Sequence, residues 1–156
     1  MNNTEFAYTT YIKTTPEKLW KAITTAEFQS QYWSPGMESD WRKGSAWRAI
    51  NDGKVSIHGQ ILESDPPKRL VMTWVDSSVS EPQDSHVTFV IEPVGEMVRL
   101  DVIHGNLQSS PTVAQRVSAG WPRVLASLKS LLETGQALDT WAGVQRSCTA
   151  TAGEPQ

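Results

Sequence analysis

The sequence contains a single cysteine, Cys148, so no disulfide can form within the chain and a cysteine-based metal site is excluded. The three histidines, His58, His86 and His104, never stand two, three or four residues apart, the spacings that place two metal ligands on one face of a helix or strand. We therefore expect no metal site.

Long apolar runs and clusters of basic residues are also missing. No segment approaches the about 20 apolar residues that a membrane span needs, and the N-terminus lacks the basic and apolar regions of a signal peptide. Fourteen Lys and Arg against 17 Asp and Glu give a net charge of -3, which argues against a nucleic-acid partner. We expect a cytoplasmic protein.

Sequence motifs of the common catalytic and nucleotide-binding folds are absent. The chain has no Gly-x-Ser-x-Gly elbow, no Gly-x-Gly-x-x-Gly run and no phosphate-binding loop of the Walker type. Its carboxylates are scattered and fall mostly at turns, where a structural role is the simplest interpretation. We expect no cofactor, and the sequence assigns no catalytic residue.

Tryptophan, by contrast, is abundant, with seven Trp against three Phe and three Tyr. An indole is large, and its N–H group needs an acceptor when it is buried. The tryptophans therefore form either an indole-rich core or the wall of a cavity, and composition alone leaves both alternatives open.

The N-terminal third predicts one strand followed by two short helices. Residues 5–13 are rich in aromatic and β-branched types, which favours a strand. Thr15 and Pro16 then provide an N-cap and a first helical residue. A second short helix is expected from about Ala26, ended by the Trp-Ser-Pro-Gly segment at 33–36.

Between residues 40 and 105 the apolar pattern changes to a period of two, which predicts strands. Turn sequences separate them, at 43–44, 51–53, 65–68, 80–83 and 93–95. Short strands joined by loops of a few residues form an antiparallel meander rather than βαβ units.

The C-terminal part predicts one long helix. Apolar residues keep three- and four-residue spacing from Val113 to Leu132, straight through Gly120-Trp121-Pro122. Because Pro122 cannot donate to the carbonyl of Ser118, we expect a kink that lets the helix follow a curved sheet. Gly135 is the expected C-cap. We assign residues 1–135 to one domain and 136–156 to a loose tail, with Trp141 as its possible attachment.

Three blocks of the sequence, "TPEKLWKAITTAEFQSQYWSPG", "GQILESDPPKRLVMTW" and "GWPRVLASLKSLLETG", resemble the family of activators of heat-shock protein 90 ATPase homologues. That family belongs to the START/Bet v 1-like (SRPBCC, polyketide cyclase-like) superfamily, and the resemblance runs in order over residues 5–135. It implies an α+β helix-grip fold, in which a curved seven-stranded antiparallel sheet surrounds a long C-terminal helix and two short helices close one end.

Strand alternation predicts which side chains face that helix. The inward residues are expected to be Leu70, Met72 and Trp74 on one strand, Val87, Phe89 and Ile91 on the next, and Val98, Leu100, Val102 and His104 on the third. Arg99 and Asp101 are expected to face solvent. His58 faces inward only if its strand is pleated with Ser56, Gln60 and Leu62 inward, and the opposite phase is equally apolar. Each histidine is either a hydrogen-bonded packing residue or a polar group that orients a ligand.

The first functional hypothesis is a cavity of a few hundred Å³ that binds a small hydrophobic or aromatic molecule. The residues expected to bind this ligand are Trp33, Trp47, His58, Met72, Trp74, Phe89, His104 and Trp121.

Two alternatives remain. The same cavity could belong to a cyclase or hydrolase, with His104 or His58 as general base and Arg48 as electrophile. The protein could instead be an interaction module that contacts a chaperone or a second copy of itself, with Trp41 and Trp141 as exposed anchors.

Overall fold

The computed structural model describes residues 5–33 and 36–140. In this part of the chain the elements follow the predicted order. They are β1 Phe6–Ile12, α1 Pro16–Thr24, α2 Ala26–Gln29, β2 Glu38–Ser39, β3 Ala46–Asn51, β4 Lys54–Asp65, β5 Arg69–Asp76, β6 Ser85–Val94, β7 Met97–Gly105 and α3 Pro111–Thr134.

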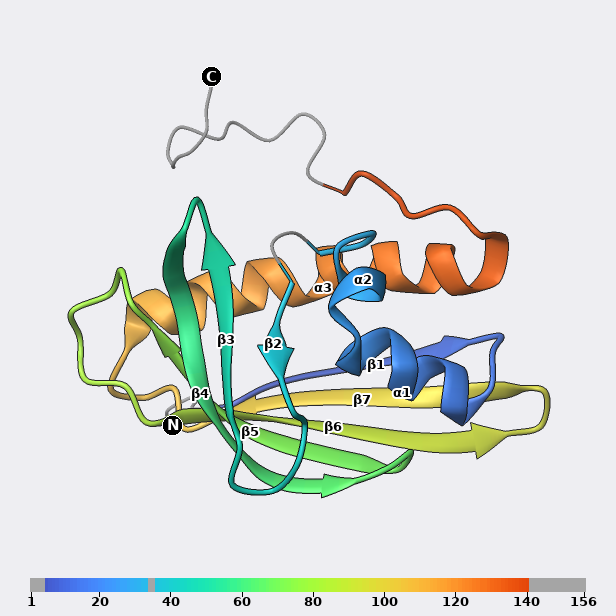
Figure 1. Ribbon diagram of the computed structural model, residues 1–156, viewed down its shortest axis with the longest axis horizontal. Coiled ribbons are helices and arrows are strands. Elements are labelled where there is room, and N and C mark those ends of the chain that lie inside the picture. The colour runs from blue at the N-terminus through green and yellow to red at the C-terminus, as the bar shows by residue number, and fades with distance from the viewer. Residues whose placement is uncertain (1–4, 34–35, 141–156) are drawn as a thin grey trace.

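The strands form one seven-stranded sheet in the order β1-β7-β6-β5-β4-β3-β2, and every neighbouring pair is antiparallel. The sheet curves strongly, and α3 lies across its concave side (Figure 1). The short helices α1 and α2 lie beside α3 on the same side of the sheet. The predicted α+β helix-grip architecture is confirmed.

Local sequence signals set the element ends as expected. The Thr15 side chain caps α1 by accepting a hydrogen bond from the Lys18 backbone N–H at 3.2 Å. Between β3 and β4, Asp52 and Gly53 have φ angles of 54° and 76°, the left-handed conformations that a tight two-residue hairpin turn requires.

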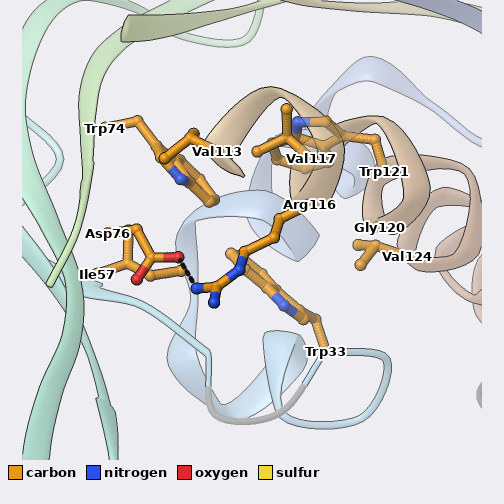
Figure 2. Close-up of a pocket in the computed structure, with 10 residues that line it drawn as sticks. All are labelled: Trp33, Ile57, Trp74, Asp76, Val113, Arg116, Val117, Gly120, Trp121 and Val124. Atoms are coloured by element: carbon orange, nitrogen blue, oxygen red, sulfur yellow. Dashed lines mark hydrogen bonds and ion pairs between the residues drawn. The ribbon is translucent and has the colours of Figure 1, made fainter. Parts of the chain in front are cut away.

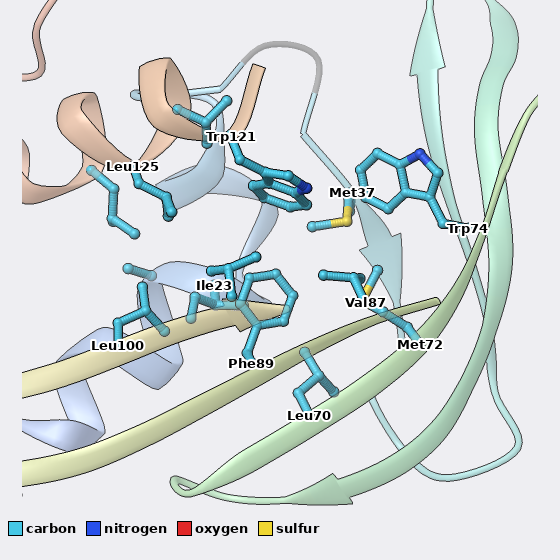
Figure 3. Close-up of a cluster of buried hydrophobic side chains, with 14 of the residues drawn as sticks. Ile23, Met37, Leu70, Met72, Trp74, Val87, Phe89, Leu100, Trp121 and Leu125 are labelled. Carbon is cyan, nitrogen blue, oxygen red and sulfur yellow. The ribbon is translucent and has the colours of Figure 1, made fainter. Parts of the chain in front are cut away.

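The core lies between the concave face and α3 (Figure 3). The inward phases predicted for three strands are confirmed, since all these side chains are buried: Leu70, Met72 and Trp74 on β5, Val87, Phe89 and Ile91 on β6, and Val98, Leu100, Val102 and His104 on β7. Arg99 and Asp101 lie on the other face, where they form an ion pair at 3.2 Å.

The phase that places His58 inward on β4 is wrong. His58 is exposed and pairs with Arg48 across the outer face, whereas Ile61 is buried. The reason lies at Gly59, where a Cβ atom would come within 2.1 Å of the Thr73 carbonyl oxygen and 2.6 Å of Trp47 Nε1. Only glycine leaves room there for the Trp47 indole, which donates to that same carbonyl at 2.8 Å.

Helix α3 runs without interruption through Gly120 and Pro122, so the prediction of one helix through this segment is confirmed. Its C-terminus is closed by Gly135, which has a φ of 87° and donates its N–H to the Leu131 carbonyl at 2.9 Å. The degree of bending at Pro122 stays a prediction.

Residues 136–140, the described part of the expected tail, are hydrogen-bonded to α3. Their backbone carbonyls accept hydrogen bonds from α3 side chains, Ser127 Oγ to Leu138 at 2.8 Å and Ser130 Oγ to Gln136 at 2.7 Å. Thr140 Oγ1 also donates to the Arg123 carbonyl at 2.9 Å. This segment therefore runs back along the helix (Figure 1). Trp141 lies outside the described residues.

Candidate functional site

A pocket opens between the N-terminal half of α3 and the ends of β4 and β5, with a cavity volume of about 140 Å³ (Figure 2). Most of its wall is apolar. The lining residues are Trp33, Ile57, Trp74, Asp76, Val113, Arg116, Val117, Gly120, Trp121 and Val124.

Three indoles from three parts of the chain form one side of this pocket. Trp33, which follows α2, stacks on Trp74 of β5 with ring centroids 6.0 Å apart and an interplanar angle of 7°. Trp121 of α3 lies 5.5 Å from Trp74 and 6.1 Å from Trp33. Composition left open whether the tryptophans form a core or the wall of a cavity. These three indoles do both, because each packs on the others and also borders the pocket.

Gly120 gives the pocket part of its depth. It lies on the face of α3 that borders the cavity, and a Cβ added there would meet no atom within 4 Å. A glycine inside a helix costs about 1 kcal/mol relative to alanine. The empty space beside it shows that crowding is not the reason for the glycine at this position.

The charged residues of the pocket stand at its rim. Arg116 Nη1 on α3 contacts Asp76 Oδ2 at the end of β5 at 2.9 Å and donates to Ser78 Oγ at 2.8 Å. The other carboxylate oxygen of Asp76 accepts from the Ser78 backbone N–H at 3.0 Å and from its hydroxyl at 2.8 Å. An ion pair thus joins the helix to the sheet beside the apolar wall (Figure 2).

His104 lies behind the indoles and is fully buried. Its Nδ1 accepts from Trp121 Nε1–H at 3.1 Å, and its Nε2 lies 3.0 Å from Ser85 Oγ. The Ser85 hydroxyl donates to the Trp74 carbonyl at 3.1 Å. Because an indole can only donate and the serine proton is used, the proton of the imidazole sits on Nε2.

Burial and, secondly, repulsion from His86 lower the pKa of His104 to about 3. The ring is therefore neutral at pH 7, and both of its nitrogens are occupied. Such a group is poorly suited to act as a general base. Its role in this geometry is to hold the Trp121 indole in one orientation.

The structure brings together three of the eight residues predicted to bind a ligand. Trp33, Trp74 and Trp121 line the pocket, and Phe89 borders a much smaller hollow next to it. Trp47, Met72 and His104 are buried in the core without bordering the pocket. His58 and Arg48 lie on the outer face, where Arg48 pairs with Glu38 at 3.4 Å.

The sequence did not reveal Asp76, Arg116 or the valines of α3 as lining residues. The valines belong to the apolar stripe of the helix, so the pattern assigned them to the core. Trp41, the expected surface anchor, is half-buried and packs against the core.

Among residues 5–33 and 36–140, no group of three His, Cys, Asp or Glu side chains is placed to hold a metal ion. None of the helices in this part of the chain has the length and apolar character that crossing a membrane requires.

A family model described as "Activator of Hsp90 ATPase homolog 1-like protein" matches residues 13–133, which is most of the chain. The protein belongs to this family. The match includes the three sequence blocks that suggested the resemblance, apart from the end of the third one. No curated protein matches the sequence.

Solved structures with a similar fold extend the comparison. The Aha1 dimer from Colwellia psychrerythraea has a TM-score of 0.74 at 20% identity, over 86% of this chain and 100% of that one. An Hsp90 activator from Plasmodium falciparum has a TM-score of 0.71 at 24% identity, covering 83% and 96% of the two chains. CalU16 from Micromonospora echinospora has a TM-score of 0.69 at 22% identity, covering 84% and 77%.

Proposed function

We propose that this protein binds a small hydrophobic or aromatic molecule in the pocket between α3 and the sheet. The observation that carries the proposal is an apolar cavity of about 140 Å³, walled by three indoles and open at the Asp76–Arg116 rim. A dry apolar cavity of about this size takes up a single aromatic ring. The pocket is smaller than the few hundred Å³ expected from the sequence, so a one-ring ligand, or one ring of a larger ligand, fits best.

Titration of the purified protein with a panel of one-ring aromatic compounds, followed by tryptophan fluorescence, tests this proposal. Because Trp33, Trp74 and Trp121 border the pocket, a bound ring should change the emission in a saturable way. A panel that leaves the emission unchanged at concentrations up to the solubility limit would contradict the proposal.

A matched pair of helix variants makes the test specific to the pocket. Gly120→Leu extends a side chain into the cavity from a position with free space and should abolish saturation. Ala119→Leu adds the same side chain one residue earlier, on the exposed face of α3, and should leave binding unchanged. Equal binding by both variants would place the ligand elsewhere.

A second candidate function is contact with a chaperone or with a second copy of the chain. Two observations favour it, namely that one similar structure is a dimer and another is an Hsp90 activator. Sedimentation of the purified protein, alone and with Hsp90, tests both forms of this candidate. Sedimentation at the monomer mass in the protein alone, together with no co-sedimentation with Hsp90 in the mixture, would remove it.

We do not propose the enzyme alternative in the form given by the sequence. It requires His58 or His104 as a general base at the cavity. His58 is exposed on the outer face, and both nitrogens of His104 are engaged within the core.

A further inference from the structure

Trp74 differs from the other buried tryptophans because its indole N–H group has no hydrogen-bond acceptor in the described part of the chain. Trp47 Nε1 donates to the Thr73 carbonyl at 2.8 Å, and Trp121 Nε1 donates to His104 at 3.1 Å. Within residues 5–33 and 36–140, the Nε1–H of Trp74 has no acceptor. A buried donor without a partner is unfavourable, so this exception calls for a physical reason.

The remaining accessible surface of Trp74 points to that reason. Its side chain is nearly buried, with 5% of the residue exposed. Every fully enclosed polar side-chain atom of the described residues has a hydrogen-bond partner, so Trp74 Nε1 must still reach open space. The open space that Trp74 borders is the pocket, and Figure 2 shows its indole at the edge of that space. Trp74 is therefore a lining residue of the pocket whose indole N–H has no acceptor among the described residues.

The charged rim adds further donors rather than acceptors. Arg116 uses Nη1 for its two hydrogen bonds, to Asp76 and Ser78, and no other N–H of its guanidinium has an acceptor in the described part of the chain. The Asp76 carboxylate already receives three hydrogen bonds. The polar groups of this pocket that still lack a hydrogen-bond partner are thus mainly donors.

We infer that the pocket selects one-ring compounds that carry a hydrogen-bond acceptor, such as a carbonyl oxygen, and that this oxygen accepts from Trp74 Nε1–H. The inference rests on the proposed function, since it specifies the class of ligand for the same cavity. The apolar walls take up the ring, and the indole N–H fixes the end that carries the oxygen. A compound of equal shape without an acceptor loses this bond and leaves the donor unsatisfied.

Three one-ring probes of similar size and equal number of non-hydrogen atoms test the inference. Acetophenone carries a carbonyl acceptor, isopropylbenzene carries neither donor nor acceptor, and 1-phenylethylammonium carries a cationic donor. We expect acetophenone to bind about three- to tenfold more tightly than isopropylbenzene, the range for one neutral hydrogen bond. The ammonium compound should bind more weakly than acetophenone, because Asp76 is already paired.

The indole N–H signals of the protein report the contact directly. In ¹H–¹⁵N spectra, the Trp74 signal should move downfield with acetophenone and show no such downfield shift with isopropylbenzene. Trp74→Phe identifies that signal by its loss, keeps an aromatic ring in place, and should reduce the affinity ratio of the two probes to about one. Trp20→Phe, on α1 and away from the pocket, is the matched control and should keep the ratio.

The outcomes separate this inference from the proposed function. If isopropylbenzene and acetophenone bind equally in the pocket, the proposed function stands and the acceptor requirement is wrong. The acceptor requirement is also wrong if the ammonium compound binds most tightly or if the Trp74 signal does not move. If none of the probes binds, the proposed function fails and the inference fails with it. If Trp74→Phe does not fold, the affinities of the wild-type protein for acetophenone and isopropylbenzene still test the acceptor requirement.

Discussion

His104 on β7 and Trp121 on α3 are joined by a buried hydrogen bond of 3.1 Å, in which the indole donates and the imidazole accepts. This bond needs a neutral imidazole. Protonation of Nδ1 would place two donors face to face and bring a charge into the core.

The stability of the protein should therefore depend on pH through His104. Burial lowers its pKa to about 3 in the folded protein, against about 6.5 in an unfolded chain. Between these values the unfolded state binds more protons, so stability is complete above about pH 6.5 and falls as the pH is lowered toward 3. At pH 5 this residue should cost about 2 kcal/mol of unfolding free energy relative to pH 8.

Urea titrations at several pH values measure this cost. His104→Gln keeps a side chain that can accept and donate but cannot titrate, and it should flatten the curve between pH 8 and 5. His58→Gln, on the exposed face, should retain the decrease. If His104→Gln retains the full decrease in unfolding free energy between pH 8 and 5, groups other than His104 cause that decrease.

Gly59→Ala should destabilise the protein by about 1–3 kcal/mol through overpacking. A Cβ atom at this position meets the backbone oxygen of Thr73 at 2.1 Å and Nε1 of the buried Trp47 at 2.6 Å, so the strand or the indole would have to shift. Gly105→Ala in β7 is the control, because its Cβ would come no closer than 3.9 Å to another atom. Chemical denaturation that shows equal midpoints for both variants would contradict the close approach at Gly59.

Gly120→Ala should stabilise the protein by about 0.5–1 kcal/mol. The position is helical and the added methyl group meets open space, so the variant gains helix propensity without a clash. Gly135→Ala should have the opposite effect, since its φ of 87° is unfavourable for a residue with a side chain. Thermal unfolding of the two variants checks both directions.

Glu81→Gln should loosen the first turn of α3. The carboxylate accepts from the Thr112 backbone N–H at 3.0 Å, from the Thr112 hydroxyl at 2.8 Å and from the Ser110 hydroxyl at 2.9 Å. These bonds lower the pKa of Glu81, which shows that they favour its ionised form. We expect faster hydrogen exchange at residues 112–115, with Glu96→Gln in an exposed turn as the unaffected control.

Much of the fold could be predicted because its signals are local. The cap at Thr15 and the helix end at Gly135 each depend on a few neighbouring residues. The inward phase of β7 was equally clear, since Val98, Leu100 and Val102 alternate with the charged Arg99 and Asp101. The period of two alone was sufficient there.

The phase of β4 and the rim of the pocket could not be predicted in this way. Both phases of β4 are apolar, and the deciding contact, between Gly59 and the Trp47 indole, joins different strands. Arg116 and Asp76 lie 40 positions apart in the sequence, and nothing near either residue indicates a pocket. Only the curvature of the sheet toward α3 brings them together. The candidate site therefore depends on tertiary contacts that no short stretch of sequence encodes.

The attachment of residues 136–140 to α3 has a practical consequence for shortening the chain. Truncation after Gly135 would remove the carbonyl that accepts from Ser127, a side chain on a residue only 2% exposed, and would leave that hydroxyl without its acceptor. A shortened protein that folds stably should accordingly retain the chain through Thr140, five residues beyond the C-cap of the helix at Gly135.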